Sequence, residues 1–313
     1  MSRHWLFRLE WGDHPITAGR LVYLLKVKFG DGLRTAYYRD AVRPMILEAA
    51  PVLDLPEDRS CEIHVLTSKD DWLNLLWALR TFQRCAGKTY ALCIHDDGSL
   101  KPRSMEILRT TLPRARIISR SVSDARMSEV LAAFPRCREL RDTNKLSLKV
   151  FDFAAFLETD RMILLDSDIL FFDQPHALLA ALDDPAFTHN TLNKDWSDGY
   201  TIDLAATRPL LDFDCPPRIN SGLGLIHKNS LRLDWIEQFL ALPGILSHSH
   251  QIEQTLIALC SAKFGFQMLP AEYDVHTGPR NPREPSRHYA GPTRPQMYSE
   301  GIRALVKSGF LKK

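Results

Sequence analysis

Short apolar runs alternate with segments of helical periodicity along most of this chain of 313 residues. Apolar runs predict strands at Ile63–Leu66, Tyr90–His95, Ile117–Ile118 and Met162–Leu165. Apolar residues at helical spacing predict helices around Trp72–Phe82, Met105–Leu112, Val130–Phe134 and Lys145–Leu157. Ser68 with Asp71 has the pattern of a capping box before the first helix. This alternation predicts an α/β fold with a mostly parallel central sheet and helices on both faces. Ligands of such sheets bind beyond the carboxyl ends of the strands.

The composition is that of an ordinary soluble globular protein, with 45% hydrophobic and 25% charged residues. Forty Lys and Arg against 38 Asp and Glu give 40 − 38 = +2, which provides no overall field for binding nucleic acid. The six cysteines form no C-x-x-C pair and are interpreted as reduced thiols of a cytoplasmic protein. The apolar stretch Leu21–Val27 is interrupted by Lys26 and is too short for a membrane span. We therefore expect no transmembrane anchor and no nucleic-acid partner.

Two acids follow the most apolar predicted strand. Asp166 and Asp168 are two residues apart, so in extended chain their carboxylates project to one side and can reach one divalent cation. Oxygen ligands suit Mg²⁺ or Mn²⁺, which take further ligands from a diphosphate. The alternative is that both acids cap a turn or the next helix. The position directly after Met162–Leu165 favours the metal-binding interpretation.

Two further short patterns point to a ligand site less specifically. Asn220 and Gly222 precede a predicted strand, where the amide could bind a ligand and the glycine could let the main chain approach it. Glu253 and Gln254 open a segment of helical spacing. Taken alone, the first pattern is an ordinary turn and the second a solvated first turn of a helix.

A loop near the C-terminus combines three residue types that suit a metal and a phosphate. His288 is a candidate metal ligand, the N–H of Gly291 can face a phosphate, and Arg294 can clamp it. A single histidine in a loop is usually a surface residue. The combination of all three types is what singles the loop out.

Together these motifs resemble the retaining glycosyltransferases of family eight. Asp166-Ser167-Asp168 is similar to their D-x-D, Asn220-Ser221-Gly222 to their N-A-G turn, and Glu253-Gln254 to their D-Q pair. His288, Gly291, Arg294 and Pro295 follow their H-x-x-G-x-x-K-P loop with arginine in place of lysine. Lys149 occupies the place of a basic residue near the sugar and diphosphate, and Thr67 and Ser68 lie where the first strand meets the nucleotide base. The resemblance covers Cys61 to Tyr298.

The resemblance implies a GT-A (Rossmann-like) fold and a metal-dependent transfer of sugar, with retention, from a nucleotide diphosphate donor. UDP-sugar is the favoured donor, and a saccharide or lipid-linked saccharide is the implied acceptor. Asp166, Asp168 and His288 would hold Mn²⁺ or Mg²⁺. The cofactor-binding set would be Thr67, Ser68, Asn220, Gly222, Gly291 and Arg294. The catalytic set would be Gln254, Glu253 and Lys149. Asp195, Trp196 and Asp198 are candidates for contacting the acceptor.

Two other functions remain open from the sequence. A phosphatase similar to the haloacid dehalogenases would use Asp166 as nucleophile and Asp168 as acid. It would also need a later acidic pair on another strand end and a lysine nearby, and Asp183-Asp184 lies too close in a predicted loop. A non-catalytic module that binds nucleotide-sugar would keep the site without turnover.

The chain divides into three predicted parts: an N-terminal extension, residues 1–60; a GT-A domain, residues 61–298; and a basic amphipathic tail, residues 299–313. The tail interleaves apolar residues with lysines and arginine, a pattern that can rest on an anionic membrane. Such a stripe more often packs on its own domain, which is the interpretation we favour. The resulting expectation is a cytoplasmic protein, with peripheral contact at the inner membrane face as the alternative.

Overall fold

A central seven-stranded sheet organises the computed structural model, which describes residues 23, 25–26, 28–49 and 55–312. The strand order is β3-β2-β1-β4-β7-β6-β8. The strands are β1 Glu57–Thr67, β2 Thr89–Asp96, β3 Arg116–Ile118, β4 Arg161–Leu165, β6 Asn190–Lys194, β7 Ile219–His227 and β8 Phe266–Met268. Neighbouring strands are parallel except at β7, which runs antiparallel to both β4 and β6. The predicted mostly parallel sheet is confirmed; the reversed direction of β7 was not predicted.

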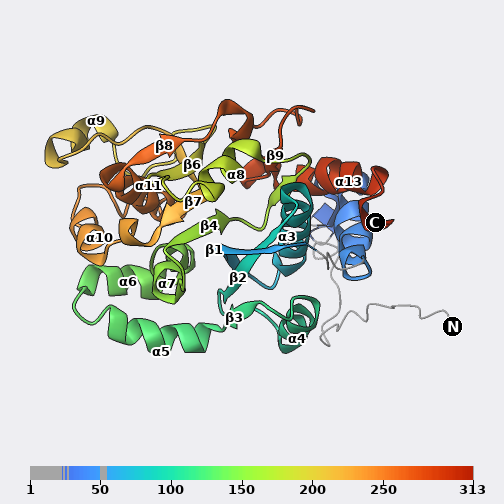
Figure 1. Ribbon diagram of the computed structural model, residues 1–313, viewed down its shortest axis with the longest axis horizontal. Coiled ribbons are helices and arrows are strands. Elements are labelled where there is room, and N and C mark those ends of the chain that lie inside the picture. Colours follow the sequence, from blue (N-terminus) through green and yellow to red (C-terminus); the bar gives the residue numbers. More distant parts are fainter. Residues whose placement is uncertain (1–22, 24, 27, 50–54, 313) are drawn as a thin grey trace.

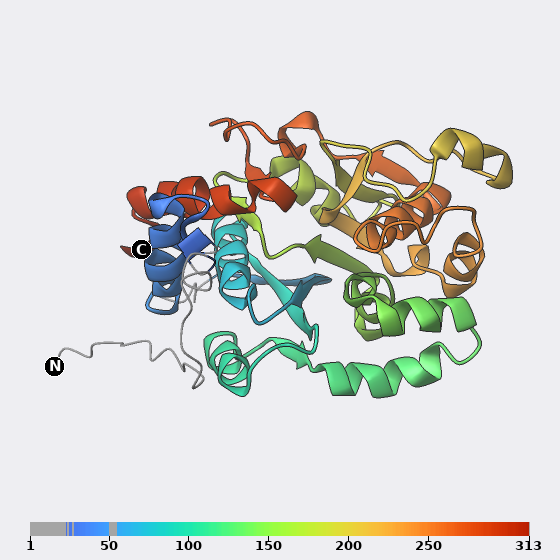
Figure 2. The same ribbon diagram turned by 180° about the vertical axis from the view of Figure 1, so that it is seen from behind.

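Helices cover both faces of this sheet (Figures 1 and 2). The helices of the described residues are α2 Leu33–Tyr37, α3 Trp72–Ala86, α4 Pro102–Thr111, α5 Arg120–Val130, α6 Pro135–Thr143, α7 Leu148–Phe156, α8 His176–Asp183, α9 Leu204–Thr207, α10 Leu233–Phe239, α11 Ile252–Phe264, α12 Arg294–Gln296 and α13 Arg303–Lys307. In β4, Ile163 and Leu165 join the core that includes α3 and α8, whereas Met162 and Leu164 join the core that includes α7 and α11. A strand buried on both faces needs a continuous apolar run, which explains the sequence of β4.

Two local predictions need correction. The helix expected around Val130–Phe134 ends at Val130, and a new helix, α6, begins at Pro135, because proline fits the first turn of a helix and not its interior. Ser68 does not cap α3. The residue before α3 is Asp71, and the Ser68 hydroxyl donates a hydrogen bond to Asp71 Oδ2 at 3.0 Å.

A second, two-stranded sheet brings the C-terminal loop to the end of β4. β5 (Ile169–Phe171) pairs antiparallel with β9 (Ser286–His288), and Ile169 lies opposite His288. The backbone N–H of Tyr289 also donates to the carbonyl oxygen of Asp168 at 3.0 Å. The pairing therefore places His288 beside the acidic turn.

The described part of the N-terminal extension and the tail pack together beside α3 (Figure 1). Most of residues 1–24 and residues 50–54 of the predicted extension lie outside the described residues. Ile46 is fully buried, and Trp77 of α3 stacks on Phe310 with ring centroids 5.6 Å apart. The apolar tail residues Ile302 and Leu305 are also buried, so this face of the tail packs on the domain. No helix in the described ranges combines the length and apolarity needed to cross a bilayer.

Candidate functional site

The acidic turn Asp166–Asp168 joins β4 to β5 at the carboxyl end of β4. The backbone N–H of Asp166 donates to the carbonyl oxygen of Gly222 in β7 at 2.8 Å, which fixes the turn against the neighbouring strand. Asp168 is buried, and the side chain of Asp166 is 28% exposed. The site therefore has one sheltered carboxylate and one that solvent or a ligand can reach.

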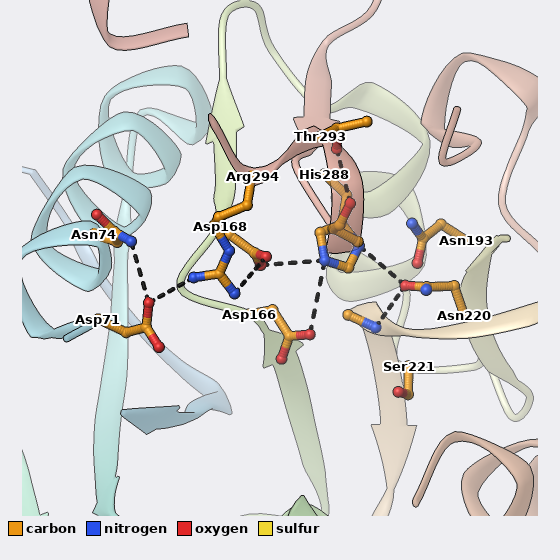
Figure 3. Close-up of polar contacts among 12 residues, drawn as sticks. Asp71, Asn74, Asp166, Asp168, Asn193, Asn220, Ser221, His288, Thr293 and Arg294 are labelled. Atoms are coloured by element: carbon orange, nitrogen blue, oxygen red, sulfur yellow. Dashed lines mark hydrogen bonds and ion pairs between the residues drawn. The ribbon is translucent and has the colours of Figure 1, made fainter. Parts of the chain in front are cut away.

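His288 faces both acids (Figure 3). Its Nε2 lies 3.2 Å from Asp168 Oδ1 and 3.8 Å from Asp166 Oδ2. One ligand atom from each of the three residues lies within 4.8 Å of the other two. Two carboxylates and one imidazole at this separation form a donor set that fits a divalent cation. The structure thus brings together the three residues that the sequence predicted as metal ligands.

Arg294 reaches the same carboxylate from the start of α12 (Figure 3). Its two terminal nitrogens lie 2.9 Å from Asp168 Oδ2 and 2.5 Å from Asp71 Oδ1. Burial alone would raise the pKa of the Asp168 carboxyl, but the guanidinium of Arg294 and the imidazole of His288 outweigh it and lower that pKa below its usual range. Burial alone would lower the pKa of His288, but the carboxylate of Asp168 outweighs burial and raises this pKa above its usual value. Asp168 is therefore held as a carboxylate.

Lys149 of α7 lies beneath the acidic turn. Its Nζ is 2.9 Å from Asp166 Oδ1 and 3.2 Å from Glu253 Oε1, and it donates to the carbonyl oxygen of Ser221 at 2.9 Å. Burial opposes a charged lysine, yet the two carboxylates raise the pKa of Lys149 above its usual value. Burial raises the pKa of Glu253 despite the nearby ammonium, and Ser221 Oγ donates to Glu253 Oε2 at 3.1 Å. Three of the predicted residues thus share one buried charge cluster.

Asn220 and Gln254 meet at the other side of the imidazole. Asn220 Nδ2 lies 3.2 Å from Gln254 Oε1 and 2.8 Å from Asp195 Oδ2, while its Oδ1 lies 3.1 Å from His288 Nδ1. Gln254 Nε2 donates to the carbonyl oxygen of Gly199 at 3.2 Å. Asp195, which the sequence indicated only as a candidate for acceptor contact, is therefore connected to the predicted site.

The remaining predicted residues lie at its edges. Thr67 ends β1, and its buried Oγ1 has no hydrogen-bond partner within the described ranges. Ser68 reaches the site through Asp71, which holds Arg294. Gly291 begins a 3₁₀ turn with φ of +52°, a left-handed conformation that favours glycine, and open space surrounds the position of a Cβ.

Asp71 is a site residue that the sequence reasoning missed. Its carboxylate accepts from Asn74 Nδ2 at 3.2 Å as well as from Arg294, so it joins the start of α3 to the C-terminal loop. The sequence signal was present, since Asp71 follows Ser68 by three residues. That spacing predicted a helix start and gave no indication of a distant arginine.

Comparison with solved structures identifies the fold. No protein-family model and no curated protein sequence matches the chain. The galactosyltransferase LgtC, solved with donor and acceptor sugar analogues, superposes with a TM-score of 0.50 and 14% identity, over 80% of this chain and 96% of LgtC. Mouse xyloside xylosyltransferase 1 in its apo form gives 0.49 and 14%, over 74% and 98%. Core-mannan synthase A from Aspergillus fumigatus in a Mn/GDP form gives 0.43 and 11%, over 80% and 85%. The first of these superpositions shows that the chain has the predicted GT-A type of α/β fold.

Proposed function

We propose that the protein is a divalent-metal-dependent glycosyltransferase that moves a sugar from a nucleotide diphosphate donor to a saccharide acceptor. The observation that carries the proposal is the convergence of Asp166, Asp168 and His288, whose ligand atoms lie within 4.8 Å of one another at the carboxyl end of β4. Ligands of open α/β sheets bind at such strand ends. LgtC, the solved structure with a TM-score of 0.50, is a galactosyltransferase by name and was solved with donor and acceptor sugar analogues.

The donor set fits Mn²⁺ or Mg²⁺ held by Asp166, Asp168 and His288. When bound, such a cation neutralises negative charge that builds on the departing nucleotide diphosphate. Arg294, beside Asp168, adds positive charge at the same edge of the site and can donate to phosphate oxygens. The N–H of Gly291 is proposed as a further donor to the diphosphate.

The sugar is proposed to lie near Gln254, with Lys149, Asn220 and Glu253 around it. A neutral amide such as that of Gln254 is a poor nucleophile, so a covalent intermediate is disfavoured. Retention then follows from attack on the same face that the diphosphate leaves, with a phosphate oxygen accepting the acceptor's proton. Thr67 and Ser68 remain predictions for the base end of the donor, for which UDP is favoured. The acceptor is proposed to be a saccharide, free or linked to lipid.

The position of Asp183 disfavours the phosphatase alternative. Asp183, half of the acidic pair that such an enzyme would need, is the last residue of α8 and forms an ion pair with Lys88. Lys149, 2.9 Å from Asp166 Oδ1, would supply the nearby lysine that such an enzyme also needs, so the argument against it rests on the acidic pair.

The direct test is release of nucleotide diphosphate from a panel of UDP- and GDP-sugars, with Mn²⁺ or with a chelator. The proposal expects one donor to be consumed only with metal. It expects Asp168→Ala to abolish this turnover while circular dichroism shows a folded protein. Full activity in Asp168→Ala, or a preference for phosphomonoesters over every nucleotide-sugar, would refute the proposed function. Donor binding without turnover would identify the non-catalytic module.

A further inference from the structure

The side-chain amide of Asn220 uses its full hydrogen-bonding capacity within the protein. Its Oδ1 accepts from the backbone N–H of Gly222 at 2.9 Å and faces His288 Nδ1 at 3.1 Å. Its Nδ2 donates to Asp195 Oδ2 at 2.8 Å and to Gln254 Oε1 at 3.2 Å. An amide offers two donors and two acceptor positions, and all four are taken here. Asn220 is buried, so exchange of these partners for water is restricted.

These partners determine which of the two amide positions is the oxygen and which is the nitrogen. A backbone N–H requires an acceptor, and an ionised carboxylate requires a donor. Rotating the amide by half a turn would place its NH₂ against the N–H of Gly222 and its oxygen against Asp195. Because Oδ1 is therefore an acceptor, the facing Nδ1 of His288 carries a hydrogen.

Gly222 provides the space in which the imidazole sits. A Cβ added at Gly222 would lie 2.3 Å from His288 Cε1 and 2.7 Å from its Nδ1, closer than any ordinary contact. The ring therefore packs against bare backbone in β7. With Nδ1 tied to Asn220, the other ring nitrogen, Nε2, is directed at Asp168 and Asp166 (Figure 3).

We propose that Asn220 is a positioning residue that fixes His288 in the tautomer with hydrogen on Nδ1, and that the segment Asn220–Gly222 of β7, predicted as a turn before a strand, is the surface on which this imidazole packs. The proposal rests on the proposed function, in which the lone pair of Nε2 binds the cation. Hydrogen bonds to the outer nitrogen of a metal-binding histidine set its tautomer and orientation. Asn220 then acts through His288, and the same amide ties that ring to Gln254 and Asp195.

The hydrogen on Nδ1 is tested without metal by ¹⁵N–¹H correlation spectra of the histidine rings, which report each ring nitrogen separately. The wild type is expected to show hydrogen on Nδ1. Asn220→Ala is expected to shift the ring toward a mixture of tautomers. Asn220→Asp keeps an acceptor for Nδ1–H and is expected to retain the wild-type tautomer. Without metal, Nε2 faces the carboxylates of Asp166 and Asp168, so a hydrogen on Nε2 in addition to that on Nδ1 agrees with the proposal. A wild-type Nδ1 without hydrogen, or an unchanged Nδ1–H in Asn220→Ala, overturns it.

Affinity for Mn²⁺, measured from the electron paramagnetic resonance of the free ion, provides the second readout. Asn220→Ala is expected to weaken binding by about 10–100-fold, the usual effect of losing such an outer partner. Asn193→Ala is the matched control, because Asn193 is a buried amide in neighbouring β6 whose Nδ2 donates to the carbonyl oxygen of Tyr273 at 3.3 Å. Wild-type affinity in Asn220→Ala would overturn this inference alone. Absence of Mn²⁺ binding in the wild type would overturn the proposed function, and the tautomer would still decide the role of Asn220.

Discussion

The ammonium of Lys149 lies 2.9 Å from Oδ1 of Asp166, although Lys149 belongs to α7 and Asp166 follows β4. Its other contacts are Glu253 Oε1 at 3.2 Å and the carbonyl oxygen of Ser221 at 2.9 Å. The Ser221 carbonyl accepts a hydrogen bond from Lys149, and the two carboxylates are its ion-pair partners. Lys149 therefore compensates two carboxylates from beneath the site, and removing its charge leaves both without a cation at this position.

Lys149→Met is expected to destabilise the protein strongly. Removing one partner of a buried ion pair costs about 3–5 kcal/mol, because the remaining charge stays buried without compensation. Glu253 is buried, so it bears most of this cost. Urea unfolding followed by fluorescence measures the free energy of unfolding.

Two controls separate charge from size in this experiment. Lys145→Met removes a lysine whose side chain is 60% exposed and pairs with Asp97 at the surface, and it is expected to change stability little. The double variant Lys149→Met with Glu253→Gln removes both buried charges and is expected to recover part of the loss. Equal destabilisation by the single and double variants would contradict the electrostatic account.

The sequence predicted the core of the site because its residues follow rules that are local. Asp166 and Asp168 come directly after an apolar run, and a strand buried on both faces is recognisable from that run alone. The family resemblance, not periodicity, linked His288 to them. Asp71 was missed because its partner, Arg294, is 223 residues away and nothing in the pattern around Ser68 encodes that contact.

The fold was predictable to a similar extent. The strands that became β1 to β4 were found from apolar runs, with boundaries that moved by up to six residues, since β1 begins at Glu57 and not at Ile63. The antiparallel direction of β7 could not be predicted in this way, because an apolar run does not indicate whether its strand is parallel or antiparallel to its neighbours. It matters for the site, since the antiparallel strand presents its first residues, Asn220 to Gly222, beside the end of β4.

Arg294→Ala is expected to lower kcat by about 100-fold or more at saturating Mn²⁺, the usual effect of losing one fixed donor to a developing anion. Arg294→Lys keeps the charge, but one ammonium cannot reproduce a fork that spans Asp71 and Asp168. Its kcat is expected to fall between the wild type and Arg294→Ala. Steady-state release of nucleotide diphosphate measures all three. Wild-type turnover in Arg294→Ala would remove the arginine from the proposed mechanism.

Gly222→Ala is expected to displace the His288 ring and weaken Mn²⁺ binding while the protein stays folded. The added methyl group would overlap His288 Cε1 at 2.3 Å. Gly278→Ala is the control, because a Cβ there would meet His276 Nδ1 at 3.6 Å, an ordinary contact. Titration with Mn²⁺ and circular dichroism compare the two variants. Equal Mn²⁺ affinity in both variants would show that the position of the His288 ring does not depend on Gly222.

Glu62 is expected to make the stability of the protein fall in acid. Burial alone would raise the pKa of Glu62, but hydrogen bonds from His64 and Arg116 bring it to about 2, against an ordinary value of 4.5. A carboxyl whose pKa is lower in the folded state stabilises that state above its ordinary pKa, and this contribution is lost as the pH falls from about 4.5 to about 2. A difference of this size corresponds to about 3 kcal/mol. Urea unfolding at several pH values should show a shallower acid dependence for Glu62→Gln than for the wild type. If the free energy of unfolding fell equally with pH in Glu62→Gln and in the wild type between about pH 4.5 and 2, other carboxylates would cause the acid sensitivity.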